Sequence, residues 1–195
     1  MSVELRFGVT ENQQAKVANI FYDAFGAKFN KFYGNKPKVI NFLSKSLRND
    51  RTVVALKNGK LVGFAGLEHD KKSFIGPCFK QTSHVFDLAT FVAVFVAKFF
   101  VLAKKTKPKE LHLESLAVSK TERGKWVGSK LLQFVLNYAR SKGFSQIKLE
   151  VVDTNPRARQ LYERFGFKEV EVHKVPYPFS FLLGFKSVTE MVCNL

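Results

Sequence analysis

A basic turn containing two glycines is the part of the sequence best suited to chemistry. It runs from Glu122 to Leu132 and reads Glu-Arg-Gly-Lys-Trp-Val-Gly-Ser-Lys-Leu-Leu. An apolar segment that predicts a strand, residues 111–118, precedes it, and a segment that predicts a helix, residues 131–142, follows it. A turn between a strand and a helix directs several backbone N–H groups and the positive end of a helix dipole to one point. We therefore expect an anion cradle here, suited to a phosphate or a pyrophosphate.

Trp126 occupies the position of this cradle at which a further glycine is expected. Backbone N–H groups, rather than side chains, would bind the anion. The indole can therefore point outward without blocking the site, and we expect that orientation. An indole pointing inward would crowd the anion instead.

The hydrophobic pattern indicates the elements that must position this turn. Asn58-Gly59 predicts a tight hairpin between two of the expected strands. Strand and helix segments alternate in the second half of the chain, which is typical of a parallel or mixed α/β sheet. Strands are expected at residues 3–9, 52–56, 61–66, 111–118, 147–152, 167–172 and 188–192. Helices are expected after a cap at Thr10 or Asn12, and at residues 39–47, 131–142 and 156–165.

A second motif follows the cradle and reads Asn-Pro-Arg-Ala-Arg-Gln-Leu-Tyr-Glu-Arg-Phe-Gly-Phe over residues 155–167. With the cradle, it resembles the GNAT superfamily of acetyl-coenzyme A-dependent N-acetyltransferases. The family's pyrophosphate motif, Arg/Gln-x-x-Gly-x-Gly/Ala, is matched at its first and last positions by Arg123 and Gly128. Its second motif, Asn-x-x-Ala-x-x-Leu-Tyr-x-x-x-Gly-Phe, is matched in full by Asn155, Ala158, Leu161, Tyr162, Gly166 and Phe167. Two motifs at the expected separation are a specific signal.

The resemblance implies an α/β fold with a GNAT-type mixed, splayed central sheet flanked by helices, as a single domain over residues 1–195. It also implies that an acetyl group moves from acetyl-coenzyme A to a primary amine by direct attack in a ternary complex. The acceptor is not readable from the sequence: an amino acid, a peptide N-terminus, a lysine or a small amine remain open. The residues implied to bind the cofactor are Leu116, Ala117, Val118, Arg123, Gly124, Lys125, Trp126, Val127, Gly128, Ser129, Asn155, Arg157 and Ala158.

Three side chains are candidates for proton transfer. In enzymes resembling this one, a tyrosine at the position of Tyr162 protonates the departing thiolate. An alkylamine is mostly protonated at neutral pH and needs a base before it can attack, and related enzymes place bases at the positions of Glu114 and His112. We expect Glu114 to be the base and name His112 second, because both are costly to bury in an apolar strand without a cleft or a partner. A purely structural pairing of the two stays open, and Glu68 and Asp153 are weaker candidates for acceptor binding.

The strand period makes a further prediction about these residues. Side chains two apart share a face, so His112, Glu114, Leu116 and Val118 are expected on one face of their strand. Among the remaining histidines, His69, His84 and His173 lack ligand spacing with cysteine or carboxylate, so the sequence predicts no metal site.

The net charge and the cysteines limit the classes of function that this protein can have. The chain has 195 residues and a formal charge of +16, from 32 basic and 16 acidic side chains. Such an excess attracts polyanions, yet the basic residues are spread along the chain, so general surface charge is favoured over nucleic-acid binding. Cys78 and Cys193 have no metal-like spacing, and the N-terminus lacks the pattern of a signal peptide, so a cytoplasmic protein is expected. The alternatives are a non-catalytic acyl-coenzyme A-binding module, or a charge-driven binder of nucleic acid or membrane surfaces.

Residues 70–109 interrupt the series of strands. Within them, residues 85–102 are apolar almost all round and predict an extra helix between strands 3 and 4. Asp87, Thr90 and Lys98 argue against a membrane span, so burial against the protein or a second copy in a homodimer is expected. A lid over the acceptor is also open. The lysines after it leave contact with an anionic membrane surface as a minor alternative.

Overall fold

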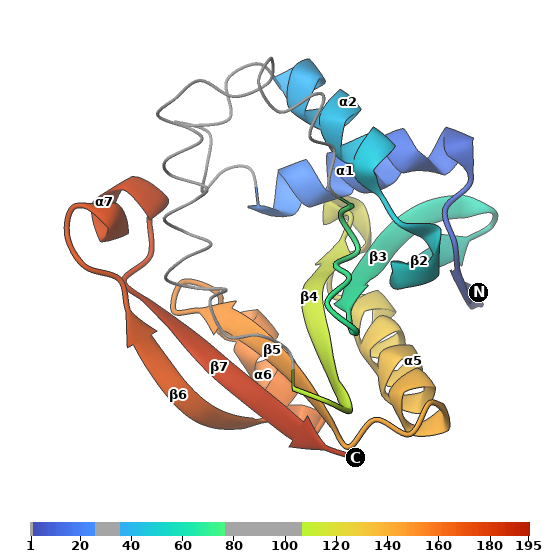
Figure 1. The fold of residues 1–195 in the computed structure, drawn as a ribbon. Helices are drawn as coiled ribbons and strands as arrows, with labels where there is room; N and C mark the ends of the chain where they lie inside the picture. The colour runs from blue at the N-terminus through green and yellow to red at the C-terminus, as the bar shows by residue number, and fades with distance from the viewer. Residues whose placement is uncertain (1, 26–35, 77–106) are drawn as a thin grey trace.

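A seven-stranded mixed sheet organises the molecule. The computed structural model describes residues 2–25, 36–76 and 107–195, and the strands lie in the order β1-β2-β3-β4-β5-β7-β6 (Figure 1). The pairing of β4 with β5 is parallel, and the other described pairs are antiparallel. All seven expected strands are present: β1 (Val3–Phe7), β2 (Thr52–Lys57), β3 (Lys60–Glu68), β4 (Glu110–Val118), β5 (Gln146–Val152), β6 (Lys168–Lys174) and β7 (Ser187–Asn194).

Helices cover both faces of this sheet. The described α-helices are α1 (Glu11–Phe25), α2 (Lys36–Ser46), α5 (Val127–Ser141), α6 (Pro156–Arg164) and α7 (Phe179–Leu183). The 3₁₀ turn η2 (Asn49–Arg51) lies between α2 and β2, and the 3₁₀ turn η3 (Lys120–Glu122) lies between β4 and α5. Helix α5 begins at Val127 rather than at the expected Leu131. Helix α7 was not expected, because a five-residue apolar segment is too short to show a helical period.

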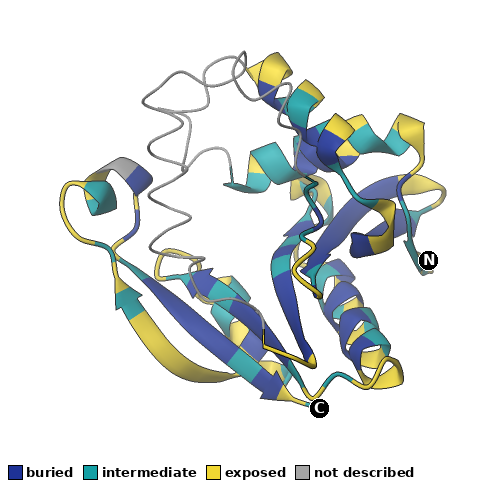
Figure 2. Cartoon of the chain, in the orientation of Figure 1, coloured by how far each residue is buried: buried dark blue, intermediate teal, exposed yellow. Residues whose placement is uncertain are grey.

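The alternation of side chains in β2 shows how the two layers form. Val53 and Ala55 are buried in the hydrophobic cluster beneath α5, whereas Val54 and Leu56 are buried in the cluster beneath α1. Figure 2 shows the central strands buried along most of their length, while the edge strand β6 is exposed. The middle of the sheet is therefore fixed by packing on both of its faces.

Three local signals in the sequence are confirmed. Asn58 and Gly59 both adopt positive φ, of 51° and 72°, as a tight hairpin between β2 and β3 requires. Gly143 follows α5 with φ of 72°, the left-handed conformation that commonly ends a helix. The side chain of Asn155 accepts a hydrogen bond from the N–H of Ala158 and caps α6, with Pro156 at the first helical position.

The expected extra helix at residues 85–102, and any homodimer formed through it, lie outside the described residues. Among the helices that the structure does describe, none combines the length and the apolar character needed to cross a membrane.

Candidate active site

Strands β4 and β5 pair over a short stretch and then separate. Their register joins Glu110 to Gln146, Leu111 to Ile147 and His112 to Lys148, and no pair follows, although β4 continues to Val118. On its other side, β5 pairs with β7 along its whole length (Figure 1). Among the residues that the structure describes, residues 113–118 of β4 thus have no strand partner on the β5 side, and we call this stretch the open edge. The splayed sheet that the resemblance implies is confirmed.

A β-bulge in β4 sits at the start of the open edge. Gly66 of β3 pairs with Ser115 and Leu67 pairs with Leu113, so Glu114 has no partner on β3. The extra residue changes which face the following side chains occupy. Bulges of this kind change the direction in which side chains point, and here the bulge leaves Glu114 with no residue opposite it on β3.

The bulge overturns one prediction from the strand period. Leu116 and Val118 pack with Leu111 and Leu113 in the cluster beneath α5, rather than sharing a face with His112. Ala117 is buried in the opposite cluster, beneath α1. The two-residue alternation holds only in unbroken strands. A bulge depends on how the partner strand pairs, so β4's own residues could not reveal it.

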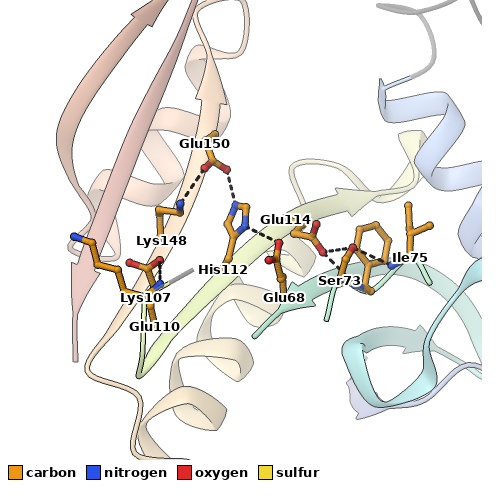
Figure 3. Close-up of polar contacts among 10 residues, drawn as sticks. Glu68, Ser73, Ile75, Lys107, Glu110, His112, Glu114, Lys148 and Glu150 are labelled. Atoms are coloured by element: carbon orange, nitrogen blue, oxygen red, sulfur yellow. Dashed lines mark hydrogen bonds and ion pairs between the residues drawn. The ribbon is translucent and has the colours of Figure 1, made fainter. Parts of the chain in front are cut away.

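The carboxylate of Glu114 is half-buried and held by a loop that follows β3. It accepts hydrogen bonds from the Ser73 hydroxyl at 2.7 Å and from the Phe74 backbone N–H at 3.1 Å (Figure 3). Burial raises the pKa of Glu114 above its usual range, while these two hydrogen bonds oppose that rise. The ionised form of a carboxylate with a raised pKa is more basic than a carboxylate in water.

Packing of Phe74 on the sheet explains why this loop reaches Glu114. A Cβ at Gly66 would lie 2.5 Å from the Phe74 ring, so only glycine leaves room for the ring on β3. Phe74 is itself buried in the cluster beneath α1. Its backbone N–H and the neighbouring Ser73 hydroxyl are thereby brought to the bulge.

His112 is buried and bonded through both ring nitrogens. Nε2 lies 2.6 Å from an oxygen of Glu150 on β5, and Nδ1 lies 3.4 Å from an oxygen of Glu68 on β3 (Figure 3). Burial alone would lower the pKa of His112, but the two carboxylates and the charge of Glu114 outweigh it and raise the pKa to about 9. His112 is therefore an imidazolium at neutral pH and has no lone pair with which to accept a proton.

Sequence reasoning missed several members of this cluster. Glu150 and Lys148 occupy alternate positions of β5, and Lys148 Nζ lies 3.8 Å from the Glu150 carboxylate. The signal was present, because ionisable residues within a buried strand are as informative in β5 as in β4. Ser73 carried no such signal, since its contact with Glu114 depends on the path of a loop. Asp153 points elsewhere and accepts a hydrogen bond from the backbone N–H of Lys186.

The same region contains a group of donors that could hold a metal ion, although the sequence predicted none. One ligand atom each from Glu68, His112 and Glu114 lie within 4.8 Å of one another. Among the described residues, these three are the set of possible metal ligands whose donor atoms lie this close together. Because the imidazole is protonated, a cation would have to displace its proton before binding.

The cradle has the geometry of an anion-binding turn. Gly124 and Trp126 both adopt left-handed backbone, with φ of 76° and 64°, immediately before α5. The first helical hydrogen bond runs from the Lys130 N–H to the Trp126 carbonyl. Among the described residues, the backbone N–H groups of residues 123–129 find no acceptor, and no side chain caps α5. A run of free N–H groups at a helix start matches the needs of a pyrophosphate.

Side chains around the cradle are fixed in different ways. The Arg123 guanidinium donates to the carbonyl of Val118 at 3.1 Å, which ties the turn to the end of β4. Glu122 pairs with Lys57 at 2.7 Å and with Lys125 at 3.3 Å, and these contacts hold the pKa of the Glu122 carboxyl below its usual range. The Trp126 side chain is 72% exposed, as expected for an indole that points outward.

Helix α6 places Tyr162 in the core. The residue is 7% exposed, and its ring packs near Phe167 with centroids 5.9 Å apart. Burial raises the pKa of Tyr162 to about 12, so the phenol is neutral and can donate its proton at any physiological pH. In the part of the chain that the structure describes, its hydroxyl forms no hydrogen bond.

The other residues of α6 divide into structural and exposed ones. Asn155 caps the helix, as described above, and Ala158 packs at the margin of the cluster beneath α5. Arg159 is bound to Glu163 at 2.9 Å and to Glu169 at 2.8 Å, which leaves Arg157 and Arg164 as the exposed cations of this helix. Of the expected site residues, the structure brings His112 and Glu114 together around the open edge and groups residues 123–129 in the cradle.

Known proteins are similar to this chain in sequence or in fold. Residues 16–167 match the sequence model of the Acetyltransferase (GNAT) family. A probable N-acetyltransferase camello of Xenopus tropicalis is 39% identical over 67 residues, which are 34% of this chain and 31% of that protein. A thialysine N-epsilon-acetyltransferase of Bos taurus is 38% identical over 64 residues, which are 33% of this chain and 38% of that protein. The chain thus spans about a third of the length of each relative.

Among solved structures, an N-acetyltransferase from Staphylococcus aureus Mu50 superimposes with a TM-score of 0.65. It is 17% identical, with 100% of this chain and 99% of that one covered. This likeness supports the fold, and the family match covers most of the chain, including the cradle and α6. The protein therefore belongs to the acetyltransferase (GNAT) family.

Proposed function

We propose that this protein is an N-acetyltransferase that moves an acetyl group from acetyl-coenzyme A to a primary amine, by direct attack in a ternary complex. The observation that carries the proposal is the end of the β4–β5 pairing at His112, with a half-buried carboxylate, Glu114, at the first bulge beyond it. An open strand edge beside a basic carboxylate can receive both an acyl donor and an amine.

The residues present fit coenzyme A. The free N–H groups of residues 123–129 would bind the pyrophosphate, and the open-edge residues Leu116, Ala117 and Val118 would pair with the amides of the pantetheine arm. Arg123 supports the turn from behind by its bond to Val118, and Lys125 and Arg157 add positive charge near the phosphates. Asn155 and Ala158 act through the start of α6, which the Asn155 cap fixes.

Two groups of the chain move protons in the proposed reaction. Bound acetyl-coenzyme A supplies a thioester, whose acyl carbon is the electrophile. Glu114 takes one proton from the ammonium form of the acceptor, and the freed lone pair forms the new C–N bond as the C–S bond breaks. The nitrogen then loses its second proton to solvent to give the neutral amide, and Glu114 releases the proton it accepted to solvent. Tyr162 gives its phenolic proton to the departing sulfur and regains a proton from solvent. The buried, neutral state of Tyr162 and the raised pKa of Glu114 suit these opposite roles.

The test is an assay of thiol release from acetyl-coenzyme A across a panel of amines: amino acids, peptides with free N-termini, lysine peptides and small alkylamines. We expect transfer to at least one of these classes. A protein that binds acetyl-coenzyme A but acetylates none of them would be a binding module, and the proposal would be wrong.

Replacing Tyr162 by phenylalanine tests the assigned acid. Tyr162→Phe should lower kcat by about a hundredfold, the lower end of general acid catalysis, with little change in the affinity for coenzyme A. Tyr177→Phe is the matched control, because Tyr177 is 83% exposed and should keep full activity. Equal kcat values for the two variants would remove Tyr162 from the mechanism.

A further inference from the structure

Three strands contribute ionisable side chains to one row across the sheet. His112 of β4 pairs in register with Glu68 of β3 and with Lys148 of β5, and Glu150 lies two residues further along β5. Alternate residues of a strand share a face, so Lys148 and Glu150 lie on the same face of β5. Figure 3 shows the imidazole between the carboxylates of Glu68 and Glu150.

This row crosses the point at which β4 and β5 separate. The pair of His112 and Lys148 is the last backbone pair between the two strands. The 2.6 Å contact from His112 to Glu150 therefore joins β4 to β5 where backbone hydrogen bonds stop. Glu68 ties the same ring to β3, in the strand that leads into the loop of Ser73 and Phe74.

An imidazole can make both contacts as a donor only when it is protonated. A neutral ring carries one N–H and one lone pair, and a lone pair facing a carboxylate is repelled. With both ring nitrogens facing carboxylates, the neutral form would lose one of the two bonds. The cross-strand connection thus depends on the proton that the ring holds.

We propose that His112 is a positioning residue whose protonated ring bridges Glu68 and Glu150 across β4 and so holds the open edge, with Glu114, in its working geometry. The inference rests on the proposed acetyltransferase function for its kinetic consequences, whereas the bridge itself does not. It replaces the earlier expectation that His112 could serve as the base.

The charges that face the ring come from each strand packed around it. They are Glu68 of β3, Glu114 of β4, and Glu150 with Lys148 of β5. Lys148 Nζ lies 3.8 Å from the Glu150 carboxylate and is the cation of this row contributed by β5. The three carboxylates outnumber the one lysine, so the surroundings favour the imidazolium, in agreement with its raised pKa of about 9.

The first experiment measures the bridge without any reaction. Titration of the histidine ring signals of the full chain by NMR, with His112 assigned by their loss in His112→Gln, should give a midpoint near pH 9. Glu150→Gln keeps the shape and an acceptor but removes the charge, and it should move the midpoint down. Glu4→Gln, an exposed carboxylate on β1, is the matched control and should leave it unchanged. A wild-type midpoint at or below the ordinary value of about 6.5 would overturn the bridge.

The second experiment asks whether the bridge positions the site. The kcat of the wild type should fall on the alkaline side with the midpoint found by NMR, well below the value of about 12 given for Tyr162. Glu150→Gln should move this fall to lower pH in step with the NMR midpoint. His112→Gln should remove the fall and lower kcat at neutral pH by about tenfold to a hundredfold, through misplaced reacting groups.

The outcomes separate this inference from the proposed function. A kcat profile that is the same in the wild type and in Glu150→Gln, despite a shifted NMR midpoint, would show that the bridge does not position the site. If the wild type acetylates no amine, the proposed function fails, while the NMR titration still decides whether the bridge exists.

Discussion

Two ionisable residues two positions apart in β4 are held in different environments because their partners differ. His112 meets carboxylates from both neighbouring strands and keeps its proton. Glu114 meets a hydroxyl and an N–H group, which stabilise its ionised form against the effect of burial. The sequence could name Glu114 first and His112 second as candidates, but it could not show what holds each of them, because Glu68 and Glu150 lie about forty residues away on either side.

The environment of Glu114 makes a prediction about pH. Ser73→Ala removes one hydrogen bond that lowers the pKa of Glu114, so this pKa should rise further. A base works in its ionised form, and the acidic limb of kcat/KM should therefore move to higher pH, with the plateau nearly unchanged. Ser141→Ala is the control, since Ser141 is exposed and bonds only within α5. An acidic limb that stays in place in Ser73→Ala would argue against Glu114 as the base.

At the scale of elements, the sequence predicted what local patterns determine. The strands, the Asn58-Gly59 hairpin and the capped start of α6 all depend on neighbours along the chain. The bulge at Glu114 depends on the register with β3 and was missed, and so was the start of α5 at Val127. In the latter case Trp126 adopts the left-handed conformation that ends the turn, a role for which glycine is the usual signal.

The backbone of Trp126 leads to a prediction about stability and binding. A φ of 64° strains a residue that has a Cβ by about 1–2 kcal/mol, and a glycine at this position would remove that strain. Glycine also has greater conformational freedom in the unfolded chain, which cancels part of this gain in stability. Trp126→Gly should therefore raise the free energy of unfolding by up to about 1 kcal/mol. Because the indole is 72% exposed, the affinity for coenzyme A should change little.

Urea unfolding and calorimetric titration check both parts. Trp126→Ala is the matched control, since it removes the indole but keeps a Cβ, and it should bring no gain in stability. A gain in affinity of about tenfold or more for Trp126→Gly, equivalent to about 1.4 kcal/mol, would show that the indole crowds the cradle.

At the scale of the whole molecule, the charge around β4 is opposite in sign to the net charge of the protein. The chain carries a net charge of +16, yet four carboxylates, Glu68, Glu110, Glu114 and Glu150, gather on or beside β4. They come from three strands, so composition could not reveal the cluster. The fold therefore gathers carboxylates within a basic protein, an arrangement that would suit both the protonated amine and the anionic cofactor of the proposed reaction.

The protonated His112 should also make global stability depend on pH. Its pKa of about 9 in the folded state exceeds the ordinary value of 6.5, so its contribution is complete below pH 6.5 and is lost as pH rises through 9. The contribution is on the order of 3 kcal/mol. Urea unfolding of the wild type and of His112→Gln across this range should show the difference between them shrinking with rising pH. A constant difference would contradict a protonated His112 in the folded state.

The central claim is that Glu114 accepts the proton of the amine at the open edge of β4. The most direct test is the single-turnover rate of acetyl transfer to the best amine of the panel, for the wild type and for Glu114→Gln at neutral pH, with coenzyme A affinity measured alongside. We expect the variant to bind coenzyme A normally and to react about a hundredfold to ten-thousandfold more slowly. Equal rates in the two proteins would contradict the account.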